Sequence, residues 1–124
     1  CSHMVMLPDG RLMVNGGRNH VKTTSIFDFS TNSWSQDFAM NHGRWYPTSV
    51  ALPDGKVFTA SGSGQPNAAN TAEVWIDGTG WFELDDVDWT PIAQENSFES
   101  HWWPHVFVDP RGDLFHAGPT EDMH

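Results

Sequence analysis

The stretch LPDGRLMVNGG, residues 7–17, decides the fold, because the chain repeats it. Residues 52–62 read LPDGKVFTASG, and residues 108–119 read VDPRGDLFHAGP. Each copy places a glycine-containing turn before a short apolar segment, and a glycine break follows that segment. Internal repetition with a period of roughly 20–50 residues indicates a repeat architecture such as a solenoid or a propeller.

Each repeat predicts four short β-strands. Turns of the Pro-Asp-Gly type join antiparallel strands, because glycine readily adopts positive φ. The apolar segments after the turns are rich in Val, Leu and Phe, which favours buried strands. A second strand pair follows each break, TSIFDF with Trp34 in the first copy and AEVWID with Trp81 in the second. Four strands in about 40–50 residues, with glycine after the second and Trp on the fourth, are typical of kelch-type propeller blades.

We therefore predict an all-β fold of about two and a half propeller blades, with a β-sandwich as the alternative. The first blade spans about 1–39, the second about 40–84 and the first half of the third about 101–124, with an acidic loop at 85–100. Because propellers have at least about four blades, an arc of this size exposes apolar faces and strand edges. We expect the chain to be part of a larger propeller or to self-associate.

Composition excludes several classes of function. The 124 residues include 16 acidic and 6 basic side chains, a net charge of −10, which disfavours binding to nucleic acid. No apolar run approaches the roughly 18 residues that span a membrane, and the N-terminus shows no signal-peptide pattern. One cysteine rules out an internal disulfide framework. Motifs of serine hydrolases, P-loop proteins and dinucleotide-binding folds are absent from the sequence.

The repeat predicts a site at one end of the first strands. Nine residues before the turn glycine, the three copies carry Cys1, Tyr46 and Trp103. First strands line the central channel of a propeller, so Cys1 and Tyr46 are expected at equivalent points at the same mouth of that channel. Alternatively, Cys1 is a terminal residue without a role and Tyr46 is ordinary packing. Residues 2–4, Ser-His-Met, also resemble the remnant of a cleaved expression tag.

These features resemble the galactose oxidase and glyoxal oxidase family of copper-radical oxidases. The resemblance covers nearly the whole chain and is carried by the Cys1 start, VNGG, TSIFDFSTNSW, Met40, GRWYP, LPDGKVFTASG and HAGPTEDMH.

The resemblance implies that the blades belong to a seven-bladed propeller, and it implies a specific chemistry. In this family, a Cys at the position of Cys1 is joined by a thioether to the ring of a Tyr that matches Tyr46. That Tyr is also a copper ligand and carries a radical. Copper and the radical oxidise a primary alcohol or an aldehyde hydrate, and oxygen is reduced to hydrogen peroxide. Phenolate and imidazole ligands suit Cu(II). The resemblance also implies a secreted or extracytoplasmic protein and a small alcohol or aldehyde substrate.

Two departures limit what the resemblance implies. The family takes a second Tyr and two His from later blades as copper ligands, whereas Tyr46 is the only tyrosine in this chain. Gly64 stands where galactose oxidase places a stacking Trp. We therefore expect at most half of a copper site, and no catalysis by the chain alone. A non-catalytic kelch-like module that self-associates, or docks on a partner, is the alternative function.

Other residues suggest weaker hypotheses. His101 and His105 would share a face of a strand and form an independent metal site, although polar packing is the alternative. The aspartates of loop 85–100 lack the glycine and terminal Glu of a calcium loop. The adjacent tryptophans 102–103 suit either sugar stacking or core packing. We expect Arg44 to be structural and to join one blade to the next by charge-assisted hydrogen bonds.

Overall fold

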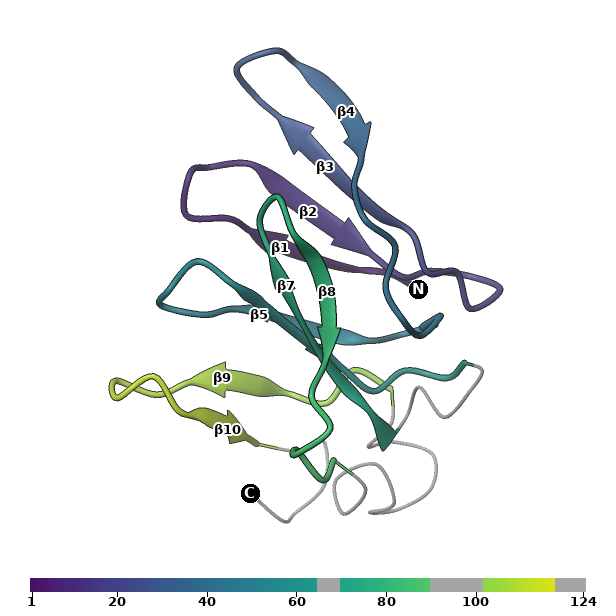
Figure 1. Cartoon of the computed structure of the whole chain (residues 1–124), viewed down its shortest axis with the longest axis vertical. Coiled ribbons are helices and arrows are strands. Elements are labelled where there is room, and N and C mark those ends of the chain that lie inside the picture. The colour runs from purple at the N-terminus through teal and green to yellow at the C-terminus, as the bar shows by residue number, and fades with distance from the viewer. Residues whose placement is uncertain (65–69, 90–101, 118–124) are drawn as a thin grey trace.

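The computed structural model describes residues 1–64, 70–89 and 102–117, which form ten β-strands in three antiparallel sheets (Figure 1). In chain order the strands are β1 (His3–Met6), β2 (Leu12–Asn15), β3 (Thr24–Asp28), β4 (Ser33–Gln36), β5 (Thr48–Ala51), β6 (Val57–Ala60), β7 (Ala72–Ile76), β8 (Gly80–Glu83), β9 (Val106–Val108) and β10 (Leu114–His116).

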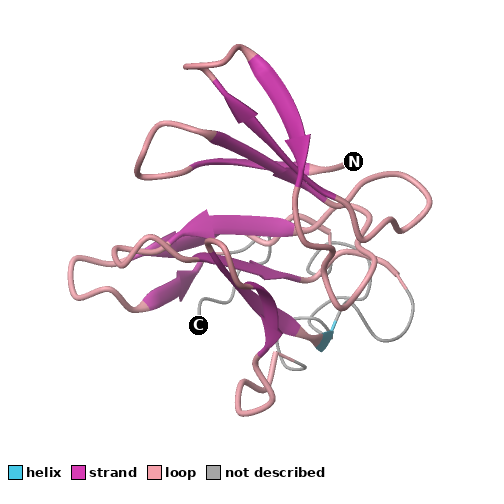
Figure 2. Cartoon of the chain, turned by 45° about the horizontal axis from the view of Figure 1, so that its top comes forward, coloured by secondary structure: helices cyan, strands magenta, loops and turns pink. Residues whose placement is uncertain are grey.

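The sheets confirm the expected all-β fold of a partial propeller. Strands β1 to β4 and β5 to β8 form two four-stranded sheets in sequential order, and β9 pairs with β10. Figure 2 shows loops at both ends of each sheet, and no α-helix occurs within the described ranges. None of those residues forms a helix long and apolar enough to cross a membrane. The number of blades in a complete ring, the kelch type and the blade boundaries remain predictions.

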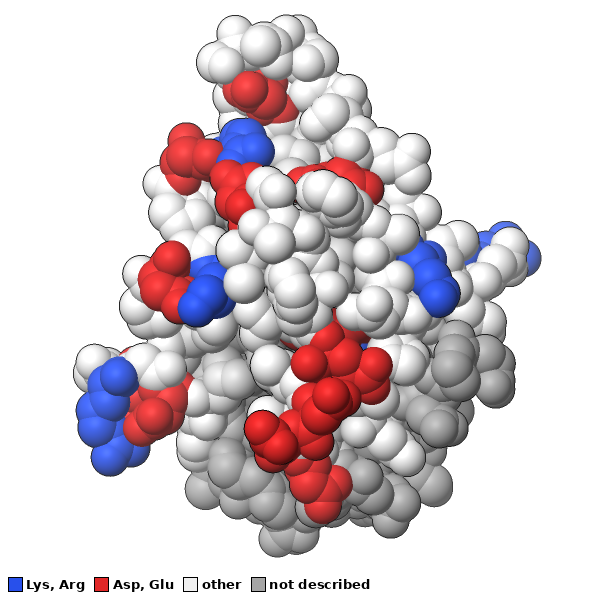
Figure 3. Space-filling model, viewed as in Figure 1, with Lys and Arg blue, Asp and Glu red and all other residues white. Residues whose placement is uncertain are grey.

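The repeated turn has the same construction in all three sheets. Each turn glycine has positive φ: Gly10 (90°), Gly55 (86°) and Gly112 (92°). An aspartate in each turn accepts a hydrogen bond from the backbone N–H two residues later and pairs with that residue's cationic side chain. The backbone contacts are Asp9 with Arg11 (3.0 Å), Asp54 with Lys56 (3.2 Å) and Asp109 with Arg111 (2.8 Å). Figure 3 shows these turns as clusters of opposite charge along one side of the molecule.

The main core lies between the first two sheets. Alternate residues of each strand point to opposite faces, so one face of the first sheet packs on one face of the second. Trp81 on β8 also donates a hydrogen bond from Nε1 to Thr24 Oγ1 on β3 at 2.9 Å, which ties the outer part of the second blade to the first. The buried members of this cluster are Leu7, Met13, Ile26, Met40, Val57, Trp75 and Trp81.

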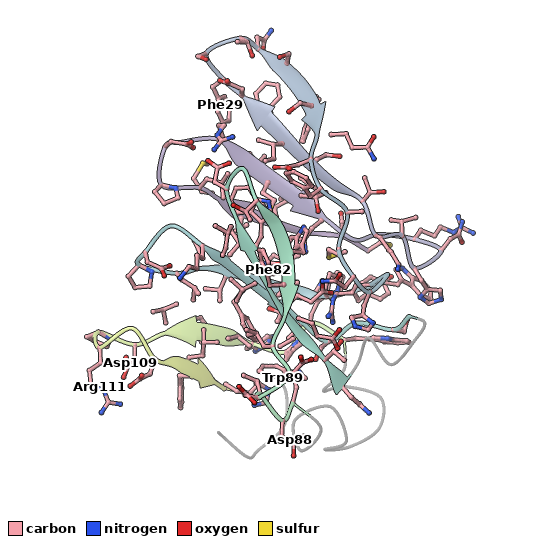
Figure 4. All side chains as sticks on the ribbon, viewed as in Figure 1. Phe29, Phe82, Asp88, Trp89, Asp109 and Arg111 are labelled. Atoms are coloured by element: carbon pink, nitrogen blue, oxygen red, sulfur yellow. The ribbon has the colours of Figure 1, made fainter. Side chains whose placement is uncertain are left out.

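A second core lies on the other face of the second sheet. It contains Phe58, Ala60, Ala72 and Trp89, and Val106 of β9 packs against it. Trp89 belongs to the segment that the sequence predicts to be a solvated acidic loop. Its side chain is instead buried and donates from Nε1 to Ser61 Oγ at 2.6 Å. Figure 4 shows Trp89 below β8, whereas Asp88 lies at the lower margin. Residues 90–100 of the predicted loop lie outside the described residues.

The inner strands lie side by side. Strand β1 contacts β5, and β5 contacts β9, as expected for first strands around a propeller axis. The N-terminus lies at the end of these strands opposite to the charged turns (Figure 1). This arrangement brings the segments before β1, β5 and β9 together, and it is these segments that carry the predicted site.

Candidate functional site

A series of backbone hydrogen bonds joins the three equivalent residues of the repeat. The N–H of Tyr46 donates to the carbonyl oxygen of Cys1 at 2.9 Å, and the N–H of Trp103 donates to that of Tyr46 at 3.0 Å. All three residues lie just before the inner strands rather than on them, since β1 begins at His3 and β5 at Thr48. The nine-residue spacing therefore predicted these neighbours, which lie two or three residues before the strands that follow them.

The thiol of Cys1 reaches the phenol of Tyr46. The thiol donates to the hydroxyl oxygen of Tyr46, with 3.6 Å between sulfur and oxygen. The thiol is free and exposed, and the Tyr46 side chain is half-buried. Residues 45 apart in sequence thus present an oxidisable sulfur and an oxidisable ring to each other.

Three tryptophans surround the ring of Tyr46. The ring of Trp45 stacks on it with 4.9 Å between centroids and 21° between planes, and Trp103 approaches at 4.3 Å and 65°. Trp102 lies 5.7 Å away. Of the two competing interpretations of residues 102–103, the aromatic contacts support packing. The nine-residue spacing predicted the position of Trp103. No sequence signal predicted that Trp45 stacks on the ring of Tyr46.

The backbone around Tyr46 is held in an uncommon conformation. Tyr46 has φ 64° and Trp103 has φ 50°, a region that non-glycine residues seldom occupy. Trp45 exchanges two backbone hydrogen bonds with Ser63, at 2.7 and 2.9 Å. A Cβ on Gly62 would lie 2.9 Å from the backbone nitrogen of Pro47, so the loop after β6 packs directly beneath this turn. Such positive φ values persist where the surroundings fix them, and they are frequent at functional sites.

A hollow of about 420 Å³ opens beside the site along the inner strands. Its lining includes His3, Ser49, Trp103, His105 and Phe107. Burial lowers the pKa of His3, and a contact of 3.3 Å between its Nδ1 and the carbonyl oxygen of Pro47 opposes this shift. The hollow therefore combines imidazole and hydroxyl groups with aromatic surface, which suits a small polar molecule.

Known proteins are similar to this chain in sequence and in fold. Galactose oxidase of Gibberella zeae is 30% identical over 99% of this chain and 19% of its own length. Aldehyde oxidase GLOX of Vitis pseudoreticulata is 32% identical over 93% of this chain and 22% of its own. A solved fungal alcohol oxidase of the AA5 family, in complex with copper, superposes with a TM-score of 0.88 and 25% identity over 99% of this chain and 26% of its own. No family model matches.

The chain is galactose oxidase/glyoxal oxidase-like. It spans about a fifth of the length of the curated relatives that it matches. The resemblance stated from VNGG, GRWYP and the two LPDG turns is thereby confirmed.

The described residues of this galactose oxidase/glyoxal oxidase-like chain do not make a copper site by themselves. Among them, no three His, Cys, Asp or Glu side chains come together as metal ligands. Tyr46 contributes one phenol oxygen, and His3 and His105 line the neighbouring hollow without forming such a group. His101 lies outside the described residues, so the His101–His105 metal site stays a prediction.

Arg44 contacts both blades, but its charge-assisted hydrogen bonds lie within the second blade, whereas we expected them to join one blade to the next. Its backbone carbonyl accepts from the N–H of Gly17 at 2.8 Å in the first blade. Its buried guanidinium donates to the Ser61 carbonyl oxygen at 2.8 Å and pairs with Glu73 in the second blade. Burial lowers the pKa of Arg44, and the carboxylate of Glu73 opposes that shift, so Arg44 remains charged. The turn that carries Trp45 and Tyr46 is thus anchored from both sides.

Proposed function

We propose that this chain is the part of a copper-radical oxidase propeller that carries the cysteine–tyrosine half of the catalytic site. The complete protein would oxidise a small primary alcohol or aldehyde and reduce oxygen to hydrogen peroxide. The observation that supports this proposal is the 3.6 Å contact between Cys1 Sγ and the Tyr46 hydroxyl. The relationship to galactose oxidase and GLOX supports the chemical class.

The contact is suited to an oxidative cross-link. A carbon–sulfur bond between Cys1 and the ring of Tyr46 forms with loss of the thiol hydrogen and one ring hydrogen, so two electrons and two protons leave. Dioxygen is the acceptor that we propose for them. A sulfur substituent makes the phenol easier to oxidise, and the surrounding tryptophans restrict access of water to the ring. Copper, when bound in the complete protein, supplies a one-electron oxidant and a Lewis acid.

We expect the chain alone to be inactive as an oxidase, because the described residues offer too few copper donors. The measurement is peroxide formation from the purified chain with copper and either galactose or glyoxal. Peroxide produced at a rate above that of the Tyr46→Phe variant would contradict this expectation.

The cross-link has a direct test. Trypsin releases Cys1 in the peptide 1–11 and Tyr46 in the peptide 45–56. After exposure to aerobic copper and treatment with a phosphine reductant, we expect an intact mass lower by two hydrogens and the two peptides joined. The Cys1→Ser and Tyr46→Phe variants should show neither change. Unlinked peptides with a free thiol would overturn the proposal that this half-site assembles.

The resemblance also supports a secreted or extracytoplasmic location for the protein, which is part of the proposal. Fractionation of the source cells and medium with an antibody to the chain tests it, and exclusive recovery from the cytosol would contradict it.

A second candidate function is a non-catalytic module that binds other blades. Its support is the apolar outer face of the first sheet, where Met4, Met6 and Trp34 are each more than half exposed. Light scattering at micromolar concentration tests this candidate, since a strictly monomeric chain would count against it.

A further inference from the structure

The two complete blades carry equivalent cross-strand rows. Aligning Gly10 with Gly55 matches β1–β4 to β5–β8, and the strand pairing gives one row of side chains across each sheet. In the first sheet this row, here called the leading row, is Met6, Leu12, Phe27 and Trp34. In the second sheet the leading row is Ala51, Val57, Trp75 and Trp81.

The leading row of the second blade is buried against the first blade. Val57, Trp75 and Trp81 are 0%, 1% and 8% exposed and pack with Met13 and Ile26. In the first blade the equivalent row has no blade against it among the described residues, and Trp34 is 58% exposed. Position 34 thus carries the same residue type as position 81, in the same place on the sheet, with the opposite exposure.

The leading row of the first blade forms an organised aromatic surface. The ring of Phe27 lies 5.2 Å from that of Trp34 and 4.8 Å from that of Phe29. Met4 and Met6 extend this surface along β1 and are 63% and 54% exposed. Figure 4 shows Phe29 at the outer margin of the first blade. An exposed apolar patch with this composition marks an interaction surface.

The opposite face of each blade carries a trailing row, which receives the leading row of the next blade. In the first blade the trailing row contains Val5, Met13 and Ile26, and in the second it contains Val50, Phe58 and Val74. The equivalent pair in the β9–β10 sheet is Phe107 and Phe115, which are 57% and 40% exposed. Figure 1 shows the first sheet and β9–β10 at opposite ends of the stack, so among the described residues an exposed leading row lies at one end and an exposed trailing pair at the other.

We propose that copies of this chain bind head to tail, with the leading row of one copy packed on Phe107 and Phe115 of the next. The contact between the first two blades is the model for this association. There the leading row of the second blade already packs on the trailing row of the first. This is a heterologous contact, in which different surfaces of the two copies meet. The inference rests on the second candidate function and is independent of the oxidase chemistry.

Electrostatics opposes this association and makes it dependent on salt. Each copy carries a net charge of −10, so like-charged chains repel one another at low ionic strength. Salt screens this repulsion while leaving the apolar contact intact. We therefore expect the average mass to rise with both protein concentration and salt.

The test is sedimentation velocity of the full chain at several concentrations from micromolar to sub-millimolar, with a reductant present so that Cys1 forms no intermolecular disulfide. Wild type should associate, whereas Trp34→Glu and Phe107→Glu should each remain monomeric. Val87→Glu is the matched control, because Val87 is an exposed apolar residue outside both rows (41% exposed) and should associate as wild type does. Near-ultraviolet circular dichroism establishes that each variant is folded.

Mixing the two variants distinguishes a head-to-tail contact from a symmetric one. The Trp34→Glu chain keeps its trailing row, and the Phe107→Glu chain keeps its leading row, so an equimolar mixture should form a 1:1 complex that grows no further. A wild-type chain that stays monomeric would overturn both the inference and the second candidate function. Association that persists in both variants, or a mixture that remains monomeric, would overturn only the head-to-tail arrangement. The peptide map of Cys1 and Tyr46 is unaffected by either outcome.

Discussion

The guanidinium of Arg44 lies 2.9 Å from the carboxylate of Glu73, and solvent reaches neither side chain. The carboxylate also accepts from the backbone N–H groups of Asn41 at 2.7 Å and His42 at 3.2 Å. Glu73 on β7 therefore holds Asn41, His42 and Arg44, which belong to the segment between β4 and β5. Tyr46 is two residues beyond Arg44, so the segment that this ion pair holds leads directly to the phenol.

Breaking this ion pair should destabilise the chain strongly. Arg44→Met leaves the carboxylate of Glu73 buried without its cation, which typically costs about 3–5 kcal/mol. Urea unfolding followed by tryptophan fluorescence measures the loss. Arg111→Met is the control, since the Arg111 side chain is 79% exposed and its ion pair with Asp109 should contribute little. Equal effects of the two substitutions would contradict a structural role for Arg44.

Gly16 should be far less tolerant of alanine than Gly10. Both have positive φ, of 70° and 90°, so a side chain at either position costs about 1–2 kcal/mol. A Cβ on Gly10 meets nothing within 4 Å, whereas one on Gly16 would lie 2.6 Å from the carbonyl oxygen of Arg44. The clash adds about 1–3 kcal/mol by analogy with overpacking. Urea midpoints of the two alanine variants test this, and equal midpoints would mean that the chain relaxes around Gly16.

The structure explains why the sequence predicted the fold and only part of the site. The turn glycines, the two-residue alternation and the Trp on the fourth strand are local signals, so the blades and the Cys1–Tyr46 proximity followed from counting along the repeat. The burial of Trp89 depends instead on its hydrogen bond to Ser61 across the second core. The partner of Arg44 likewise depends on β7, 29 residues away. Contacts between residues far apart in the sequence carry no local pattern, so sequence reasoning did not identify these two partners.

Removing the Trp103 ring should make Tyr46 more reactive. The two rings meet at 4.3 Å, and Trp103 is the most exposed of the tryptophans around the phenol that the structure describes. Trp103→Ala should therefore speed nitration of Tyr46 by tetranitromethane several-fold, because it opens one side of the ring to the reagent. Tyr46 is the only tyrosine, so the absorbance of the nitrophenolate at alkaline pH reports on this site alone. Thiol oxidation is avoided by using a Cys1→Ser background.

Trp34→Ala is the matched control for that experiment. Trp34 is also exposed, but it lies on the outer face of the first blade, away from Tyr46. Its removal should leave the nitration rate unchanged. A rate that does not respond to Trp103→Ala would mean that Trp45 and Trp102 shield the phenol without it.

Acid should weaken the repeated turns. The backbone N–H of Arg11 lowers the pKa of Asp9, and the Lys56 side chain lowers the pKa of Asp54. A carboxylate whose pKa is lower in the folded than in the unfolded state contributes stability above its ordinary pKa and loses it as pH falls through the folded value. We therefore expect urea midpoints to fall as pH decreases from about 4 towards 3. The Asp9→Asn/Asp54→Asn variant should show a smaller fall over this range. Identical pH profiles of the two proteins would mean that these aspartates do not stabilise the fold.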